Sequence, residues 1–158
     1  MNSELQERIH ILWDELADMD TTQFDEAARH LMNSLCDIIG AQNAVWFGAV
    51  RLGDSHPDDP IKGWRVPVFQ YLHPAQPLDA VTKEEIKRIN KDGMVDQTTV
   101  ANAAAAGRFR ANRLCDLVPD AWFQSPFYEY QYRRLGNEDA VYISFPINED
   151  AESWFGFF

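Results

Sequence analysis

The chain has 158 residues, of which 46% are apolar and 25% are charged. These values are typical of one soluble globular domain, and a chain of this length buries about two-thirds of its unfolded surface. The formal net charge of −11 opposes binding to phosphate backbones, since non-specific affinity for DNA and RNA comes from Lys and Arg. We therefore expect no direct nucleic-acid contact by this segment.

Membrane, metal and disulfide signals are weak in the sequence. No uninterrupted apolar run approaches the roughly 20 residues that a membrane span needs, and the N-terminus does not resemble a signal peptide. Cys36 and Cys115 are far apart and have no CxxC partner, so we interpret them as small buried residues in a reducing compartment. The four histidines lack ligand spacing to either cysteine. We expect a cytoplasmic protein with no membrane segment, metal or cofactor.

Two amphipathic helices are predicted at the N-terminal end. Residues 4–18 repeat apolar side chains at helical spacing, and the shared face carries Leu5, Ile9, Leu12, Trp13 and Leu16. Residues 20–22 supply an N-cap for a second helix, which ends at Gly40. The first helix can pack on its own domain or pair with a second subunit. We favour a homodimer, with Trp13 as an anchor of the interface.

The next predicted elements are two strands. Residues 43–52 are apolar on both faces and rich in β-forming residues, which indicates a central strand that is covered on both sides. Residues 64–72 predict a second strand after a polar connection that contains proline. Pro67 has no N–H to donate to a neighbouring strand, so we expect this second strand at an edge of the sheet.

The middle of the chain alternates helix and strand signals. Thr82 and Glu85 form a T-x-x-E capping box for one helix. Asp96 is an N-cap for another helix, which continues through the alanine run that follows it. Residues 109–118 predict a strand.

The C-terminal part predicts a helix and a hairpin. Ser125 and Pro126 are an N-cap and first-turn pair for a helix that extends to Leu135, and residues 140–147 and 153–158 then pair as a hairpin. The order of elements is therefore α-α-β-β-α-α-β-α-β-β. Strands interrupted by helices, with hairpins at both ends, predict an α+β fold with a central, mainly antiparallel five-stranded sheet and helices on its faces.

This order is similar to the GAF fold, a relative of the PAS fold. A loose motif of aromatic residues around S-P-F-Y adds to the similarity, and it is carried by Trp122, Ser125, Pro126, Phe127, Tyr128, Leu135, Gly136 and Asp139. Roughly residues 20–158 resemble the GAF-like N-terminal domains of LuxR-type bacterial regulators. The signatures of cyclic-nucleotide-binding GAF domains and of acyl-homoserine-lactone receptors are not evident, so neither ligand is implied.

The resemblance implies a signal-input domain that dimerises through helices and precedes a helix-turn-helix DNA-binding domain. Residues 1–158 would form one GAF-like sensor domain, and residues 1–18 would be its dimer element. The chain ends within the apolar run from Trp154 to Phe158, whereas chain ends usually lie at the surface. We therefore expect the natural polypeptide to extend beyond Phe158, with the DNA-binding domain in that extension.

Seven aromatic side chains are candidates for a ligand pocket between the sheet and the helices of residues 94–128. They are Trp46, Phe69, Tyr71, Trp122, Tyr128, Tyr142 and Trp154. Ligand sites combine apolar walls with a few placed polar groups, and Tyr and Trp supply both in one side chain. The alternative is that these rings only fill the core. Several buried O–H and N–H groups would each need a partner there, which favours a cavity.

Three arginines cluster in an otherwise acidic chain. On a strand, Arg108 and Arg110 project from one face and Arg113 projects from the other. Arg110 is therefore a candidate to bind a carboxylate or phosphate group of the ligand in bidentate geometry. The alternative is an ion pair with one of the chain's 25 Asp and Glu residues.

The sequence contains no G-x-S-x-G, P-loop or H-E-x-x-H motif, so we expect no catalytic residues and no enzyme activity. The leading hypothesis is the ligand-sensing domain of a cytoplasmic LuxR-type transcription regulator, which binds an unknown small molecule. Two alternatives stand beside it: a protein–protein interaction or dimerisation module with a degenerate pocket, and a small enzyme.

Overall fold

The computed structural model describes residues 3–53, 56–74, 80, 82–84, 86–88 and 95–158. Over this part of the chain, strands form one antiparallel sheet in the order β2-β1-β5-β4-β3. The strands are β1 (Ala44–Arg51), β2 (Trp64–Tyr71), β3 (Arg110–Arg113), β4 (Val141–Asn148) and β5 (Ala151–Phe157). The predicted α+β class with a five-stranded antiparallel sheet is confirmed, and this architecture is consistent with a GAF/PAS-like sensor domain.

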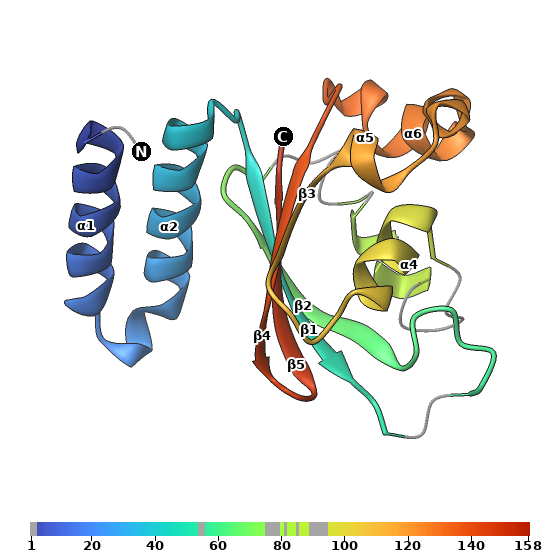
Figure 1. Cartoon of the computed structure of the whole chain (residues 1–158), viewed down its shortest axis with the longest axis horizontal. Helices are drawn as coiled ribbons and strands as arrows, with labels where there is room; N and C mark the ends of the chain where they lie inside the picture. The colour runs from blue at the N-terminus through green and yellow to red at the C-terminus, as the bar shows by residue number, and fades with distance from the viewer. Residues whose placement is uncertain (1–2, 54–55, 75–79, 81, 85, 89–94) are drawn as a thin grey trace.

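Helices cover both faces of the sheet (Figure 1). On one side lie α1 (Ser3–Ala17) and α2 (Phe24–Ile39), and on the other lie α4 (Gln97–Ala104), α5 (Leu114–Leu117) and α6 (Pro126–Gln131). Short 3₁₀ turns connect them: η1 (Thr21–Gln23), η2 (Asp120–Gln124) and η3 (Arg133–Leu135). Residues 82–84 and 86–88 are also helical. None of the helices in the described ranges combines the length and the apolar character that a membrane span requires.

Side-chain caps define several helix ends as the sequence predicts. Ser125 accepts a hydrogen bond from the backbone N–H of Tyr128 at 3.1 Å, and Pro126 occupies the first turn of α6. Gly40 ends α2 in the left-handed conformation, at φ 77°, which glycine adopts without strain. The capping box predicted at Thr82 and Glu85 lies partly outside the described residues.

Strand β2 lies at an edge of the sheet, where Pro67 predicts it, while β1 lies between β2 and β5. Because successive side chains on a strand point to opposite faces, each strand supplies both layers of the molecule. On β5, Trp154 faces α4 and Phe155 faces α2.

Two predicted elements end earlier than expected. The strand predicted over 109–118 stops at Arg113, where the backbone N–H of Leu114 donates to Ala140 at 2.8 Å and α5 then begins. Leu114 and Val118, at the two ends of this helical turn, are both buried, and their i, i+4 spacing is compatible with one face of either a helix or a strand. The helix predicted to Leu135 ends at Gln131 and continues only as η3.

In helix α1, the predicted apolar face divides in two. Leu12 is buried, whereas Trp13, one residue further along the helix, is 66% exposed. Adjacent helical residues point about 100° apart, so Trp13 cannot share the face of Leu12 that packs towards α2. A hydrogen bond of 2.7 Å between Glu15 and His30 joins the two helices.

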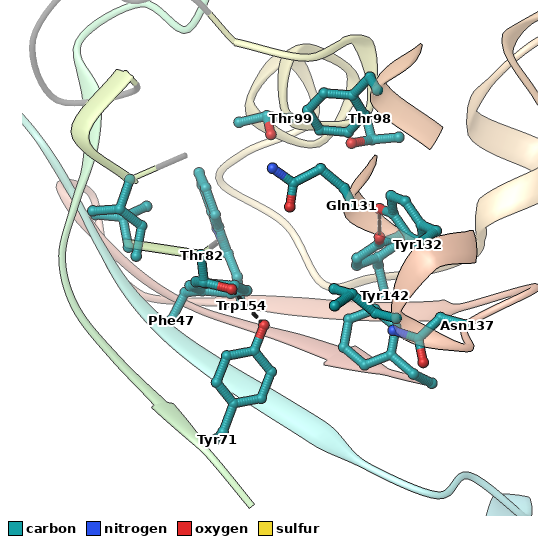
Figure 2. A pocket seen from close by; sticks show the side chains of 15 residues that line it. Phe47, Tyr71, Thr82, Thr98, Thr99, Gln131, Tyr132, Asn137, Tyr142 and Trp154 are labelled. Atoms are coloured by element: carbon teal, nitrogen blue, oxygen red, sulfur yellow. Dashed lines mark hydrogen bonds between the residues drawn. The ribbon is translucent and has the colours of Figure 1, made fainter. Parts of the chain in front are cut away.

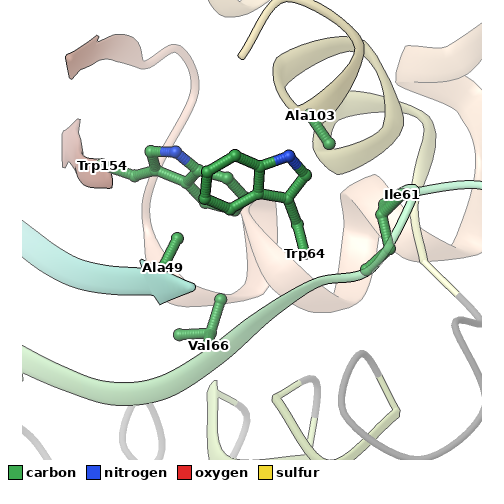
Figure 3. Close-up of a cluster of buried hydrophobic side chains, with 6 residues drawn as sticks. All are labelled: Ala49, Ile61, Trp64, Val66, Ala103 and Trp154. Atoms are coloured by element: carbon green, nitrogen blue, oxygen red, sulfur yellow. The ribbon is translucent and has the colours of Figure 1, made fainter. Parts of the chain in front are cut away.

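The apolar core has a part on each face of the sheet. A cluster between the sheet and α4 centres on the rings of Trp64 and Trp154, whose centroids lie 6.0 Å apart (Figure 3). Met32 of α2 is fully buried against Phe155 and Phe157 on the opposite face. The α4 side also carries the candidate functional site.

Candidate ligand cavity

A cavity of about 130 Å³ lies between the sheet and the helical segments that cover it, namely residues 82–88 where described, α4 and α6 (Figure 2). Its described lining comprises Phe47, Val66, Tyr71, Thr82, Ile86, Thr98, Thr99, Phe127, Gln131, Tyr132, Leu135, Asn137, Tyr142, Trp154 and Phe158. Aromatic rings and uncharged polar groups therefore form its wall.

The floor of the cavity is built by strand alternation. Phe47 of β1 and Trp154 of β5 are register partners and project to the same face. Tyr142 of β4 is the partner of Gly156. A Cβ atom at Gly156 would lie 3.3 Å from the Tyr142 ring, so the glycine lets that ring lie close to β5.

The start of α4 is held by Asp96. One carboxylate oxygen accepts from the backbone N–H of Thr98 at 2.8 Å and from its hydroxyl at 2.6 Å. The other oxygen accepts from the indole N–H of Trp122 at 3.0 Å. Asp96 thus caps the helix, fixes Thr98 at the cavity wall and ties α4 to η2.

Two hydroxyl pairs face the cavity (Figure 2). Tyr71 is hydrogen-bonded to Thr82 at 2.6 Å, and Tyr132 is hydrogen-bonded to Tyr142. Burial raises the pKa of Tyr132 and of Tyr142 above the ordinary value for tyrosine. Both phenols therefore stay protonated at neutral pH and act as neutral hydrogen-bonding groups.

A smaller cavity of about 70 Å³ adjoins the first, and Phe47, Tyr142 and Trp154 line both. Its polar end is formed by Asn102 and Ser144, whose side chains are hydrogen-bonded at 3.1 Å. The hollow therefore extends along the sheet from α6 towards β3.

Arg110 does not line either cavity, because a buried acid holds it. Its guanidinium donates to Glu152 at 3.1 and 2.7 Å, and the side chains of the pair are 6% and 0% exposed. Burial acts to raise the pKa of Glu152, but hydrogen bonds from Arg110, Gly107 and Trp154, together with the arginine charge, hold that pKa below its usual range. Arg110 therefore forms the ion pair that was the alternative to a ligand contact. The structure does not support the prediction that Arg110 binds a carboxylate or phosphate group of a ligand.

The structure brings three of the predicted pocket residues together: Tyr71, Tyr142 and Trp154 all line the cavity. Phe69 lies beside it, with its ring packed on Phe47 and Tyr71 at 6.3 and 6.1 Å. Phe69 therefore supports the wall without forming part of it.

The other three aromatic candidates lie elsewhere. Trp46 is on the opposite face of the sheet, packed against Phe24 and hydrogen-bonded to Ser153. Trp122 and Tyr128 are buried in the cluster behind α6. Because β1 is apolar on both faces, the sequence does not show whether Trp46 or Phe47 points to the cavity.

Several lining residues were missed by the sequence analysis, chiefly Tyr132, Thr98 and Gln131. Tyr132 follows Tyr128 by four residues, and this spacing places both on one side of a helical turn. Thr98 follows the N-cap Asp96 by two residues, the usual position for a cap interaction. Both signals were present in the sequence, but neither specifies a cavity.

Within the described ranges, no group of three or more His, Cys, Asp or Glu residues is arranged to hold a metal ion. Cys36 is buried as predicted, whereas Cys115 is exposed at the start of α5. The first turn of a helix at the surface explains this position, and the prediction of a buried Cys115 is wrong.

Comparisons with known proteins identify a shared fold. No family model matches the chain, and no curated protein matches it significantly in sequence. Among solved structures, it is similar to the LBD (ligand-binding domain) of VqsR from Pseudomonas aeruginosa, with a TM-score of 0.59 and 13% sequence identity. The match covers 99% of this chain and 80% of that one. The chain therefore shares the overall fold of that domain.

Proposed function

We propose that this chain is the signal-input domain of a LuxR-type transcription regulator and that it binds a small molecule in the cavity between the sheet and α4. Its similarity in fold to the VqsR LBD and the GAF-like resemblance of its sequence support this assignment. In this proposal the domain acts in the cytoplasm, performs no catalysis and makes no DNA contact of its own. The LuxR-type assignment would leave DNA binding to a separate helix-turn-helix domain.

The cavity is the observation that carries the proposal. A space of about 130 Å³ lies beside seven aromatic residues and two hydroxyl pairs. An apolar wall with a few oriented polar groups is the usual composition of a small-molecule site.

The signal would pass through the sheet to the N-terminal helices. Trp154 lines the cavity, and its neighbour Phe155 packs against Met32 and Cys36 of α2 on the opposite face. A ligand that favours one position of β5 therefore favours one position of α2. Such differential affinity for two states is sufficient to shift their populations.

The N-terminal helix would form the homodimer contact in this proposal. Ile11 and Trp13 on α1 are 49% and 66% exposed, and large exposed apolar side chains of this kind are enriched at interfaces. The same surface suits the alternative function, a protein–protein interaction module whose cavity stays empty.

A thermal-shift screen against a broad metabolite library tests ligand binding. A compound at 100 times its Kd adds about 2.7 kcal/mol to the free energy of unfolding, which raises Tm by several degrees. Thr99→Phe fills the cavity from α4 and should abolish the shift. Ala104→Phe adds the same ring at an exposed position of α4 outside the lining, and it should preserve the shift.

Two results would refute the ligand-sensing proposal. One is a screen in which no compound stabilises the protein, which would favour the interaction module. The other is a set of stabilising compounds that act equally on wild type and on Thr99→Phe, because binding would then lie outside the cavity.

A further inference from the structure

The smaller cavity ends at two side chains whose hydrogen-bonding direction is fixed, Asn102 of α4 and Ser144 of β4. The Nε–H group of Arg110 can only donate, and it lies 2.7 Å from the side chain of Asn102. The atom of Asn102 that faces Arg110 is therefore its carbonyl oxygen Oδ1, because an amide nitrogen there would set one donor against another. Since the buried Glu152 holds Arg110 in place, the Asn102 amide cannot turn over without losing this bond.

The Ser144 hydroxyl is fixed by the same oxygen. Its Oγ lies 3.1 Å from Oδ1 of Asn102, and a carbonyl oxygen can only accept, so Ser144 donates. Ser144 is 1% exposed, and with its proton used in this bond its oxygen can only accept from a further partner. The –NH2 group of Asn102 makes no hydrogen bond to any residue in the described part of the chain. This end of the cavity therefore presents a donor and an acceptor.

The donor and the acceptor lie side by side and are strengthened by their neighbours. Nδ2 and Oδ1 of Asn102 share one carbon atom, and Oδ1 is bonded to Ser144, so the –NH2 group and the Ser144 oxygen are adjacent. Donation from Arg110 to Oδ1 polarises the amide and makes its N–H groups stronger donors, while donation by Ser144 makes its own oxygen a stronger acceptor. Buried polar groups without partners cost free energy, so a ligand that pairs with both is favoured.

The other groups near this end add neither a free donor nor a charge. The indole N–H of Trp154 donates to Glu152 at 2.5 Å, so Trp154 offers the ligand only its ring. Arg110 and Glu152 neutralise each other. Among the described residues that line the two cavities, none is Lys, Arg, His, Asp or Glu. A charged ligand would therefore lose its hydration without meeting a counterion at the wall.

Aromatic rings connect this polar end with the larger cavity. Phe47, Tyr142 and Trp154 line both spaces (Figure 2). A flat apolar body can lie against these rings while its polar edge reaches Asn102 and Ser144.

We infer that the cavity selects an uncharged aromatic compound with a primary amide or lactam edge, whose C=O accepts from Asn102 and whose N–H donates to Ser144. This inference rests on the proposed function, since it names the ligand class for the same cavity. A ketone or an ester satisfies Asn102 alone. An open-chain secondary amide is trans, so its N–H and C=O point in opposite directions and it also satisfies only one of the two groups.

Three probes of one shape test the amide edge on the protein as it exists: benzamide, acetophenone and benzamidine. Benzamide offers an acceptor and a donor, acetophenone offers only the acceptor, and protonated benzamidine offers only donors. Ligand-observed NMR titrations should show benzamide binding at least about tenfold more tightly than either of the others, because each of them leaves one buried group unpaired. Thr99→Phe should block benzamide binding.

Two variants separate the donor from the acceptor. Asn102→Asp keeps an oxygen towards Arg110 but replaces the –NH2 group with a second acceptor, so benzamide should weaken at least about tenfold and benzamidine should become the tightest probe. Ser144→Ala removes the acceptor, so benzamide should weaken about tenfold while acetophenone keeps its affinity. Asn148→Asp is the matched control: it makes the same charge change at an exposed position, where the bond to the backbone of Asp150 needs only an oxygen. It should leave all three affinities unchanged.

Each outcome decides the inference. Acetophenone or benzamidine binding to wild type as tightly as benzamide would overturn the amide assignment, and so would an equal change of affinity in Asn148→Asp and Asn102→Asp. A folded Asn102→Asp that still prefers benzamide would overturn it too, and if this variant does not fold, the benzamide affinity of Ser144→Ala decides. Benzamide binding that survives Thr99→Phe would lie outside the cavity and would also overturn it. Failure of all three probes would overturn the inference, whereas a library compound whose thermal shift is lost in Thr99→Phe would leave the proposed function standing.

Discussion

The buried pair of Arg110 and Glu152 allows a sharp prediction about stability. The Arg110 side chain makes four hydrogen bonds in the structure, one to Asn102, one to the carbonyl of Arg108 and two to Glu152. Arg110→Met removes all four and leaves the Glu152 carboxylate, whose side chain is 0% exposed, without a counterion. Breaking one side of a buried ion pair costs about 3–5 kcal/mol, because an uncompensated charge stays buried.

A double variant distinguishes buried charge from lost packing. Arg110→Met combined with Glu152→Gln carries no charge, and the amide oxygen of Gln can still accept from Gly107 or Trp154. We expect the double variant to recover at least about 1.5 kcal/mol relative to Arg110→Met alone. Arg113→Met, whose partner Asp139 is exposed, is the control and should change stability little.

The pH dependence gives a second signature of the same charge. In wild type the pKa of Glu152 is lowered, so its stabilisation is present above the ordinary pKa of glutamate and is lost as pH falls through the lower folded value. Without Arg110, burial raises that pKa instead, and protonation relieves the cost as pH falls. The stability gap between wild type and Arg110→Met should therefore narrow from pH 7 to pH 5.

Urea unfolding followed by tryptophan fluorescence measures these four proteins and the single variant Glu152→Gln, which completes the cycle. The reasoning would be refuted if Arg110→Met cost under about 1 kcal/mol, or if the costs of the two single substitutions were additive in the double variant. A stability gap that widened towards pH 5 would also contradict it.

Three further outcomes follow from the structure. Ser125→Ala removes the N-cap of α6 and should cost about 1 kcal/mol in urea unfolding, whereas Ser125→Asp should restore most of it. Burial acts to raise the pKa of Asp59, but hydrogen bonds from Ile61, Gly63 and Arg65 hold it below the ordinary value. Asp59→Asn should therefore lower the urea midpoint at pH 7, and the gap to wild type should narrow only below the ordinary pKa of aspartate, as the pH falls through the lowered pKa of folded Asp59. Trp13→Ala should halve the mass measured by sedimentation, because Trp13 is the proposed dimer anchor and is 66% exposed in one chain. An unchanged mass would count against the dimer.

Local signals in the sequence predicted most elements of the fold. The caps at Asp96, Ser125 and Gly40 act through the next few residues, so they hold in any tertiary context. Pro67 predicted the edge position of β2 for an equally local reason, its missing N–H. The switch from strand to helix at Leu114 was missed because burial of Leu114 and Val118 depends on packing against distant parts of the chain.

The cavity was harder to predict residue by residue. Tyr142 and Trp154 were found because polar aromatic side chains in a core need partners, and both lie on the lining face. Trp46 was assigned to the wrong face of the sheet because both faces of β1 are apolar. The alternation of side chains along β1 separates two faces, but it does not show which of them lines the cavity. Arg110 was assigned to a ligand because its partner Glu152 is 42 residues away, a distance at which sequence spacing shows nothing.

A crystal structure with the most stabilising compound tests the central claim most directly. The account predicts electron density for that compound between Tyr142 and Trp154, under the start of α4. Density on the α2 face of the sheet or along α1, with the cavity left without the compound, would contradict it.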